Sequence, residues 1–360
     1  MRRPALILLG VALLLGVISC HRPFVPPRSQ ASSAQEGVRP VARPAPPVLG
    51  VDLYSKSNYR TAVVRVDGIR DLAYAKRFLA VASVGIAWNL YSPANHSNQI
   101  LRTRNTLTPT HVGLLTRIAR SDGLSVLYRP LVKIQGPKQW EGYVAPEDTA
   151  RWFANYFQAE LPYLRLAQKY HIKEFVVGTE IVQLEQSAPA SQWRWFLNKV
   201  RHVYRGLVSY ASWGGDFYPA RQVVPPTAWY GVTAYPDFIL PASAPVSLLV
   251  RSWIRLFRYV PHAILTRTAI QEIGIPAGDG AYHSPWNWSR PYVHNETVQV
   301  RWFLSACYAA RQLQLRGIYF WNLNLTDNPA NPPFSPVTFE GKRGASAIRL
   351  CATILAQSTG

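Results

Sequence analysis

The sequence predicts an α/β fold, a (β/α)₈ TIM barrel formed by a single domain. Short apolar runs alternate with longer amphipathic runs from residue 49 to the end of the chain. Eight of the short runs have the composition of strands. They are spread over about 300 residues, which is a suitable length for one barrel. A doubly wound open sheet is the alternative. Such a sheet usually has a glycine-rich turn after its first strand, and DLYSKSNY (52–59) is not one.

The expected strands are apolar runs of the kind that parallel sheets bury on both faces. The fourth shows the pattern well, because Phe175, Val176 and Val177 precede Gly178 and then a carboxylate, Glu180. The eight runs span residues 48–54, 83–91, 124–134, 174–181, 207–213, 229–238, 268–275 and 317–325.

The expected helices have apolar residues at helical spacing and lie between the strands. The second has the clearest ends: Thr108 is placed to cap it, Pro109 stands in its first turn and Gly123 stops it. The helical segments lie within residues 64–82, 108–123, 146–172, 191–206, 245–260, 296–315 and 344–357.

Residues 1–19 resemble the signal peptide of a bacterial lipoprotein. Arg2 and Arg3 precede an apolar stretch that is too short for a membrane span. The stretch ends in VISC, which resembles a lipobox and implies cleavage before Cys20 and a lipid on its sulfur. An ordinary secretory signal is the alternative. In either case we expect an exported protein, held at a bacterial membrane by the lipid or else secreted.

Residues 20–48 are rich in Pro, Ser and Ala and show no periodicity. We expect a disordered tether there. The predicted organisation is therefore a signal peptide (1–19), a tether (20–48) and one barrel domain (49–360).

The chain is strongly basic, with 39 Lys and Arg against 19 Asp and Glu, a formal charge of +20. The Arg residues are scattered and no nucleic-acid-binding motif is present, so we expect no nucleic-acid partner. The charge suits an anionic cell envelope or an acidic polysaccharide. The sequence is silent on oligomeric state, and we take a monomer as the default.

Neither the histidines nor the cysteines have the spacing of metal ligands, so we expect no metal and no organic cofactor. Cys307 and Cys351 are the two cysteines of the expected barrel. They could form one disulfide or remain two buried thiols, and we favour the thiols.

Two carboxylates stand at the expected C-terminal ends of strands, where barrels of this type carry their functional groups. Glu180 ends the fourth strand and Glu272 lies in the seventh, AIQEIGIP. Strands four and seven face each other across the barrel mouth. Cleavage of a glycosidic bond needs such a pair, one carboxyl group to protonate the leaving oxygen and one to attack or stabilise the sugar cation.

Several blocks of the sequence, in this order, resemble glycoside hydrolase family 113, β-mannanase-like enzymes of a large clan of retaining TIM-barrel glycosidases. The resemblance implies that Glu180 is the general acid/base and Glu272 the nucleophile. The blocks are RPLVKIQGPKQWEGYVAPED with RWFANY, FVVGTEI, VRHVYRGLVSYASW, WYGVTAYPDF, AIQEIGIP with PWNW, and GIYFWNL.

Aromatic residues at the expected strand ends are candidates for substrate binding, because sugar rings present apolar faces that pack on aromatic walls. Arg129 is a further candidate, either for a sugar hydroxyl or for Glu272, and a plain surface salt bridge is the alternative. For each aromatic candidate, packing in the core at the top of the barrel is the alternative. The candidates are Trp88, Trp140, Trp213, Tyr235 and Trp321.

Three sites depart from the pattern of the family or its clan. Thr179 stands where much of the clan has Asn, Leu131 and Lys133 replace a His and an Asp, and Thr233 replaces an acidic residue. These changes do not alter the expected class of reaction, but they leave the identity of the sugar open.

The expected function is a retaining, endo-type glycoside hydrolase acting on a β-linked polysaccharide or oligosaccharide, with mannan as the first candidate. The alternative is a non-catalytic, carbohydrate-binding envelope lipoprotein on the same barrel.

Overall fold

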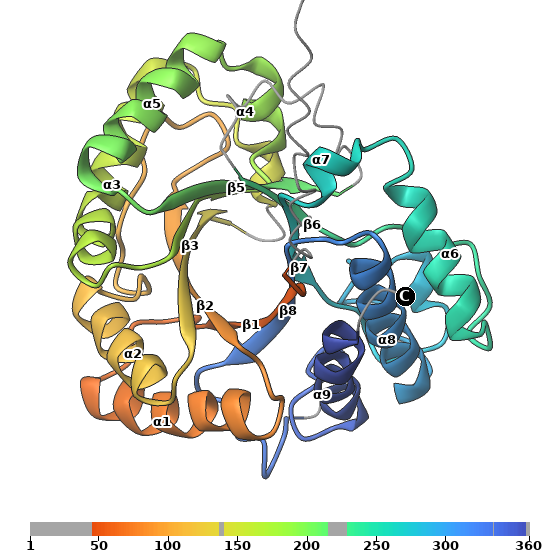
Figure 1. Ribbon diagram of the computed structural model, residues 1–360. Coiled ribbons are helices and arrows are strands. Elements are labelled where there is room, and N and C mark those ends of the chain that lie inside the picture. Colours follow the sequence, from red (N-terminus) through yellow and green to blue (C-terminus); the bar gives the residue numbers. More distant parts are fainter. Residues whose placement is uncertain (1–44, 137–139, 215–228, 334, 358–360) are drawn as a thin grey trace, which may run out of the picture. The chain divides into compact units, whose positions relative to one another are not determined.

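Eight parallel strands form a closed barrel in the order β1-β2-β3-β4-β5-β6-β7-β8, and helices surround it (Figure 1). The computed structural model describes residues 45–136, 140–214, 229–333 and 335–357, which belong to one compact unit. Closure through the β1–β8 pair confirms the predicted barrel and excludes the open sheet. The predicted signal peptide, Cys20 and residues 20–44 of the predicted tether lie outside the described residues.

All eight predicted strands are present, and most end within one or two residues of their expected positions. The sixth is five residues shorter than expected, because the chain leaves the sheet after Thr233. The strands are β1 Val48–Tyr54, β2 Ser83–Ser92, β3 Ser125–Ile134, β4 Glu174–Thr179, β5 Leu207–Trp213, β6 Trp229–Thr233, β7 Thr268–Ile273 and β8 Gly317–Asn324.

The helices follow the predicted order, and the caps of α2 confirm the reading of its ends. The Thr108 side chain accepts a hydrogen bond from the His111 amide, Pro109 occupies the first turn, and Gly123 follows with φ +72°. The α-helices are α1 Thr61–Arg77, α2 Pro109–Ser121, α3 Thr149–Lys169, α4 Val182–Ser187, α5 Ala190–Val203, α6 Val246–Leu256, α7 His262–Leu265, α8 Glu296–Gln312 and α9 Arg343–Ala356. Two short 3₁₀ helices are η1 Glu141–Tyr143 and η3 Ala281–His283.

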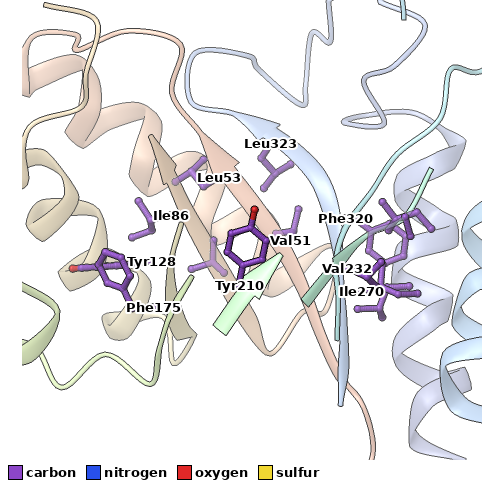
Figure 2. Close-up of a cluster of buried hydrophobic side chains, with 14 of the residues drawn as sticks. Val51, Leu53, Ile86, Tyr128, Phe175, Tyr210, Val232, Ile270, Phe320 and Leu323 are labelled. Atoms are coloured by element: carbon purple, nitrogen blue, oxygen red, sulfur yellow. The ribbon is translucent and has the colours of Figure 1, made fainter. Parts of the chain in front are cut away.

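The main core lies between the barrel and the helices, where alternate strand residues point outward. Figure 2 shows this layer with Val51, Ile86, Tyr128 and Phe320 among the buried side chains. The opposite set of side chains fills the barrel interior, and towards its N-terminal end Leu127, Val176, Ala211 and Tyr319 form a small separate cluster.

Three strands carry an irregularity that breaks the alternation of side chains. On β4, the two-residue step from Ser209 to Ala211 of β5 corresponds to three residues, Val176 to Thr179. Similar register shifts occur in the pairing of β7 with β6 and of β8 with β1. Bulges of this kind turn side chains that regular alternation would point to the other face.

Cys307 on α8 and Cys351 on α9 form a disulfide, with their Cα atoms 5.6 Å apart. The favoured expectation of two buried thiols is therefore wrong. The pairing depends on the packing of α8 against α9, and the 44-residue separation of the cysteines carries no information on that packing.

Within the described ranges, no helix is both long enough and apolar enough to cross a membrane.

Replacing both cysteines by Ala should lower the free energy of unfolding by about 2–4 kcal/mol, because the disulfide restricts a long loop of the unfolded chain. Urea denaturation with and without reductant measures the effect. Reductant should destabilise the wild type and leave the double variant unchanged. Equal stability of oxidised wild type and double variant would contradict this role.

Candidate active site

A cavity of about 790 Å³ opens at the C-terminal ends of the strands. Both predicted carboxylates line it, Glu180 directly after β4 and Glu272 within β7. The volume is in the range of sites that enclose small ligands. The structure thus brings together two groups that lie far apart in the sequence.

Glu180 occupies a strained backbone position, with φ +52°. A non-glycine residue in this left-handed region costs about 1 kcal/mol or more, so its surroundings must hold it there. The Glu180 amide donates to the Ala211 carbonyl oxygen at 2.9 Å, and the next amide, of Ile181, donates to the Tyr210 hydroxyl at 3.0 Å. The turn after β4 thereby directs the Glu180 side chain into the cavity.

The Glu180 carboxyl group is suited to carry a proton near neutral pH. Burial raises its pKa to about 7, and the neighbouring carboxylates of Glu272 and Glu141 contribute to the rise. Hydrogen bonds from Thr233 and Trp140 act in the opposite direction. The Trp140 indole Nε1 donates to Glu180 Oε2 at 2.6 Å.

Glu272 faces inward because of the bulge in β7. Its neighbour Gln271 also faces inward and donates to the side chains of Glu174 and Ser209. Regular alternation would allow only one of these two consecutive residues to do so. The extra residue therefore adds the Glu272 carboxylate to the barrel interior.

Both oxygens of Glu272 accept hydrogen bonds. The Tyr235 hydroxyl donates to Oε1 at 2.7 Å and the Arg129 Nη2 donates to Oε2 at 2.6 Å. Burial raises the pKa of Glu272, whereas the charge of Arg129 and the bond from Tyr235 lower it. Donors on both oxygens stabilise the ionised form, which a nucleophilic carboxylate must have.

Arg129 lies beneath the cavity, fully buried, and joins two carboxylates. Its Nη1 donates to Asp52 Oδ2 at 2.8 Å and also to the carbonyl oxygen of Gln271. Burial raises the pKa of Asp52 to about 7 against the opposing charge of Arg129. Gly85 makes room for this arrangement, since a Cβ there would lie 2.0 Å from Asp52 Oδ1.

Aromatic side chains form much of the cavity wall. Trp140 and Trp213 pack edge to face with ring centres 5.8 Å apart, and Tyr54 and Trp321 lie 5.1 Å apart. Such rings are typical of sites that bind the apolar faces of sugars. The aromatic residues of the lining are Tyr54, Trp140, Tyr143, Trp213, Tyr235, Trp286, Trp288 and Trp321.

Two predicted substrate-binding residues do not line the cavity. Trp88 points outward from β2 into the core and stacks on Tyr163 with ring centres 4.4 Å apart, because it alternates with the inward-facing Ala87 and Asn89. Arg129 faces inward but is fully buried under the cavity floor. It contacts Glu272, one of the partners that the sequence left open, and also Asp52, which the sequence did not predict.

Several lining residues were not predicted from the sequence. Tyr54 ends β1 and could have been found by its strand-end position, as Trp213 was. Trp286 and Trp288 come from the loop after β7 and stand in the block PWNW. Glu141 follows Trp140 and pairs with Lys133, one of the residues that depart from the family pattern. Leu131, another such residue, also lines the cavity.

The described parts of the chain contain no group of three or more His, Cys, Asp or Glu side chains that could hold a metal ion.

Comparison with known proteins gives one family match and many structural matches. The profile described as Glycoside Hydrolase Family 113 matches residues 71–331 of the 360. No curated protein is similar enough in sequence to match the chain.

The solved structures that resemble this one share its fold at low sequence identity. A GH113 β-1,4-mannanase is 18% identical with a TM-score of 0.73, covering 87% of this chain and 100% of its own. A GH113 β-mannanase from Alicyclobacillus acidocaldarius, in complex with ManMIm, is 20% identical with a TM-score of 0.70, covering 86% and 98%. A GH5_18 protein from Streptomyces cattleya, in complex with Manβ1-4GlcNAc, is 14% identical with a TM-score of 0.56, covering 87% and 82%.

Replacing Arg129 by Met should lower the free energy of unfolding by about 3–5 kcal/mol at pH 8, because Asp52 and Glu272 would remain buried without their cation. The loss should be smaller at pH 5. The folded-state pKa values of both carboxyl groups are raised, so protonation at low pH favours the folded variant.

Urea denaturation at the two pH values measures this, with Arg77→Met on the exposed face of α1 as the control, expected to change stability by less than about 0.5 kcal/mol. An Arg129→Met protein as stable as the wild type at pH 8 would show that the buried cation is dispensable.

Proposed function

This chain belongs to Glycoside Hydrolase Family 113 and is a glycoside hydrolase, and from that premise we propose that it cleaves internal β-linkages of a mannan-like polysaccharide or its oligosaccharides with retention of configuration. Glu180 is the general acid/base and Glu272 the nucleophile in this proposal. The observation that carries it is one cavity lined by two glutamates whose hydrogen-bond partners differ as the two roles require.

In the first step, Glu180 donates its proton to the glycosidic oxygen while a carboxylate oxygen of Glu272 attacks the anomeric carbon. The bond to the leaving sugar breaks and a glycosyl ester on Glu272 forms. The pKa of about 7 for Glu180 supports this role, because a sizeable fraction is protonated at neutral pH.

In the second step, Glu180 takes a proton from water, whose oxygen attacks the anomeric carbon and releases Glu272. Arg129 and Tyr235 would stabilise the departing carboxylate through the bonds that they already make. Two displacements at one carbon restore its original configuration.

The family and the structural relatives named as β-mannanases support a mannan-like substrate. Aromatic residues that reach well into solvent support binding of an extended chain. The exposed fraction is 47% for Tyr143 on the η1 side and 57% for Trp286 beyond β7. Leu131 and Lys133 line this cavity in place of a His and an Asp of the family pattern, so the polarity of the lining differs from that pattern. The panel of tested glycans should therefore be broad.

The decisive experiment is hydrolysis of mannan, glucan and xylan and their oligosaccharides by the wild type and by Glu180→Gln and Glu272→Gln. Glu272→Gln should lower kcat by about 10⁴-fold or more. Glu180→Gln should lower it by about 10²–10⁴-fold on glycans and by much less on aryl glycosides, whose leaving groups need no proton. Proton NMR should show the β-anomer as the first product.

Glu147→Gln is the matched control, because Glu147 is exposed and outside the cavity lining, and it should keep full activity. The wild-type value of kcat/KM should fall as the pH rises above about 7, where Glu180 loses its proton. Binding of glycans without turnover, or full activity of Glu272→Gln, would contradict the proposed mechanism.

We also propose that the protein is exported and anchored to a bacterial membrane through a lipid on Cys20. The VISC motif and the Pro-rich residues that follow support this proposal. In a bacterial host supplied with labelled fatty acid, the wild type should incorporate label and sediment with membranes. Cys20→Ala should do neither, while Cys307→Ala should still be labelled; label retained by Cys20→Ala would refute the anchor.

A further inference from the structure

An ion pair forms part of the cavity wall next to the proposed acid. Lys133 points inward from β3, and its Nζ donates to both oxygens of Glu141, at 2.8 and 2.9 Å. The Glu141 side chain is 8% exposed and that of Lys133 is 34% exposed, and both line the cavity. A pair this sheltered is weakly screened by solvent and salt, unlike a surface ion pair.

Glu141 is the first residue of η1, and the preceding residue is Trp140. The turn is closed by hydrogen bonds from the Tyr143 amide to the Trp140 carbonyl oxygen and from the Val144 amide to the Glu141 carbonyl oxygen. Gly142 lies against the Trp140 ring, since a Cβ there would be 2.5 Å from Cζ3. The indole is thus packed on the turn that Lys133 holds against β3.

The indole in turn reaches the proposed acid. Trp140 Nε1 donates to Glu180 Oε2 at 2.6 Å, so a continuous set of contacts runs from Lys133 through Glu141 and Trp140 to Glu180.

Four further charged or titratable groups act on Glu180 or on the pair. Glu272 on β7 and Arg129 on β3 carry charges that Glu180 senses, and Tyr235 after β6 faces the same carboxyl groups. Tyr54 on β1 lies near Lys133. Burial lowers the pKa of Lys133, but the Glu141 carboxylate outweighs this and raises it above its ordinary value, so Lys133 stays charged.

We propose that Lys133 and Glu141 are positioning residues for Glu180, which hold the Trp140 indole on its carboxyl group and balance the charge beside it. This inference rests on the proposed role of Glu180 as the acid. It gives a function to Lys133, at a position where the family pattern has an acidic residue. Neither member of the pair needs to contact the scissile bond.

The charge balance predicts opposite effects for the two single substitutions. Lys133→Met leaves the Glu141 carboxylate uncompensated, which makes proton loss from Glu180 harder. Glu141→Gln leaves the Lys133 cation uncompensated, which makes proton loss easier. The alkaline limb of the kcat/KM profile should therefore move up by about 0.5 pH unit or more in Lys133→Met and down by a similar amount in Glu141→Gln.

The double variant Lys133→Met/Glu141→Gln is the internal check, because it removes both charges and should return the alkaline limb to within about 0.2 pH unit of the wild type. Asp67→Asn is the matched control. It breaks an ion pair with Arg70 on α1, and the limb should stay in place. Thermal unfolding of each variant confirms that it is folded.

A merely structural pair would lower kcat/KM in both single variants without moving the limb, and that outcome overturns the proposal. So do shifts in the same direction. A raised KM with an unmoved limb would instead mean that Lys133 binds substrate directly, and this also overturns it.

A titration without substrate separates failure of this inference from failure of the proposed function. Carbon-13 NMR of protein labelled at the Glu carboxyl groups, with the Glu180 signal assigned from Glu180→Gln, follows Glu180 in every variant. If Glu180 is dispensable for turnover but its titration moves in opposite directions, only the proposed mechanism fails. If Glu180 is essential and its titration stays fixed, only the inference fails.

Discussion

The site depends on one buried cation. Arg129 has no exposed surface, yet it holds Asp52 on β1 and Glu272 on β7 from its own place on β3. Strands β1, β3 and β7, no two of which are adjacent in the barrel, are thereby linked to one another across its interior. A guanidinium group suits this task because it stays charged and presents several donors in a rigid plane. Because Arg129 lies under the cavity floor, it contacts the Glu272 carboxylate from below, and Glu272 still lines the cavity above.

The two glutamates have different hydrogen-bond partners because β4 and β7 place them in different surroundings. Glu272 lies above the cation and accepts a bond on each oxygen. Glu180 stands on a left-handed turn, near other carboxylates and an indole donor. Both strands carry a bulge, so the regular sheet is interrupted next to both carboxyl groups.

The alternation of apolar runs predicted the barrel and all eight of its strands, because a strand buried on both faces is a short run of mostly apolar residues. The strand-end rule likewise predicted that Glu180 and Glu272 lie at the mouth of the barrel, where both line the cavity. The strand-end rule failed for Trp88. Whether a side chain of β2 faces inward or outward depends on its place in the alternation of side chains and not on how near it lies to the end of the strand. The disulfide and the bulges depend on how distant segments pack, which no local pattern in one sequence encodes. The Lys133–Glu141 contact joins residues eight positions apart, but it depends on how η1 lies against β3.

The disulfide between α8 and α9 depends on the redox state of the compartment that holds the protein. Strand β1 closes the barrel against β8, and α9, the last helix, packs over β1. The disulfide joins α9 to α8, so it covalently links the helical layer next to the β1–β8 pair, where the first and the last strand of the barrel meet. Such bonds persist in oxidising compartments and are reduced in the cytosol. In a reducing compartment the chain would lack this covalent link between α8 and α9, and in an oxidising compartment it would keep the link.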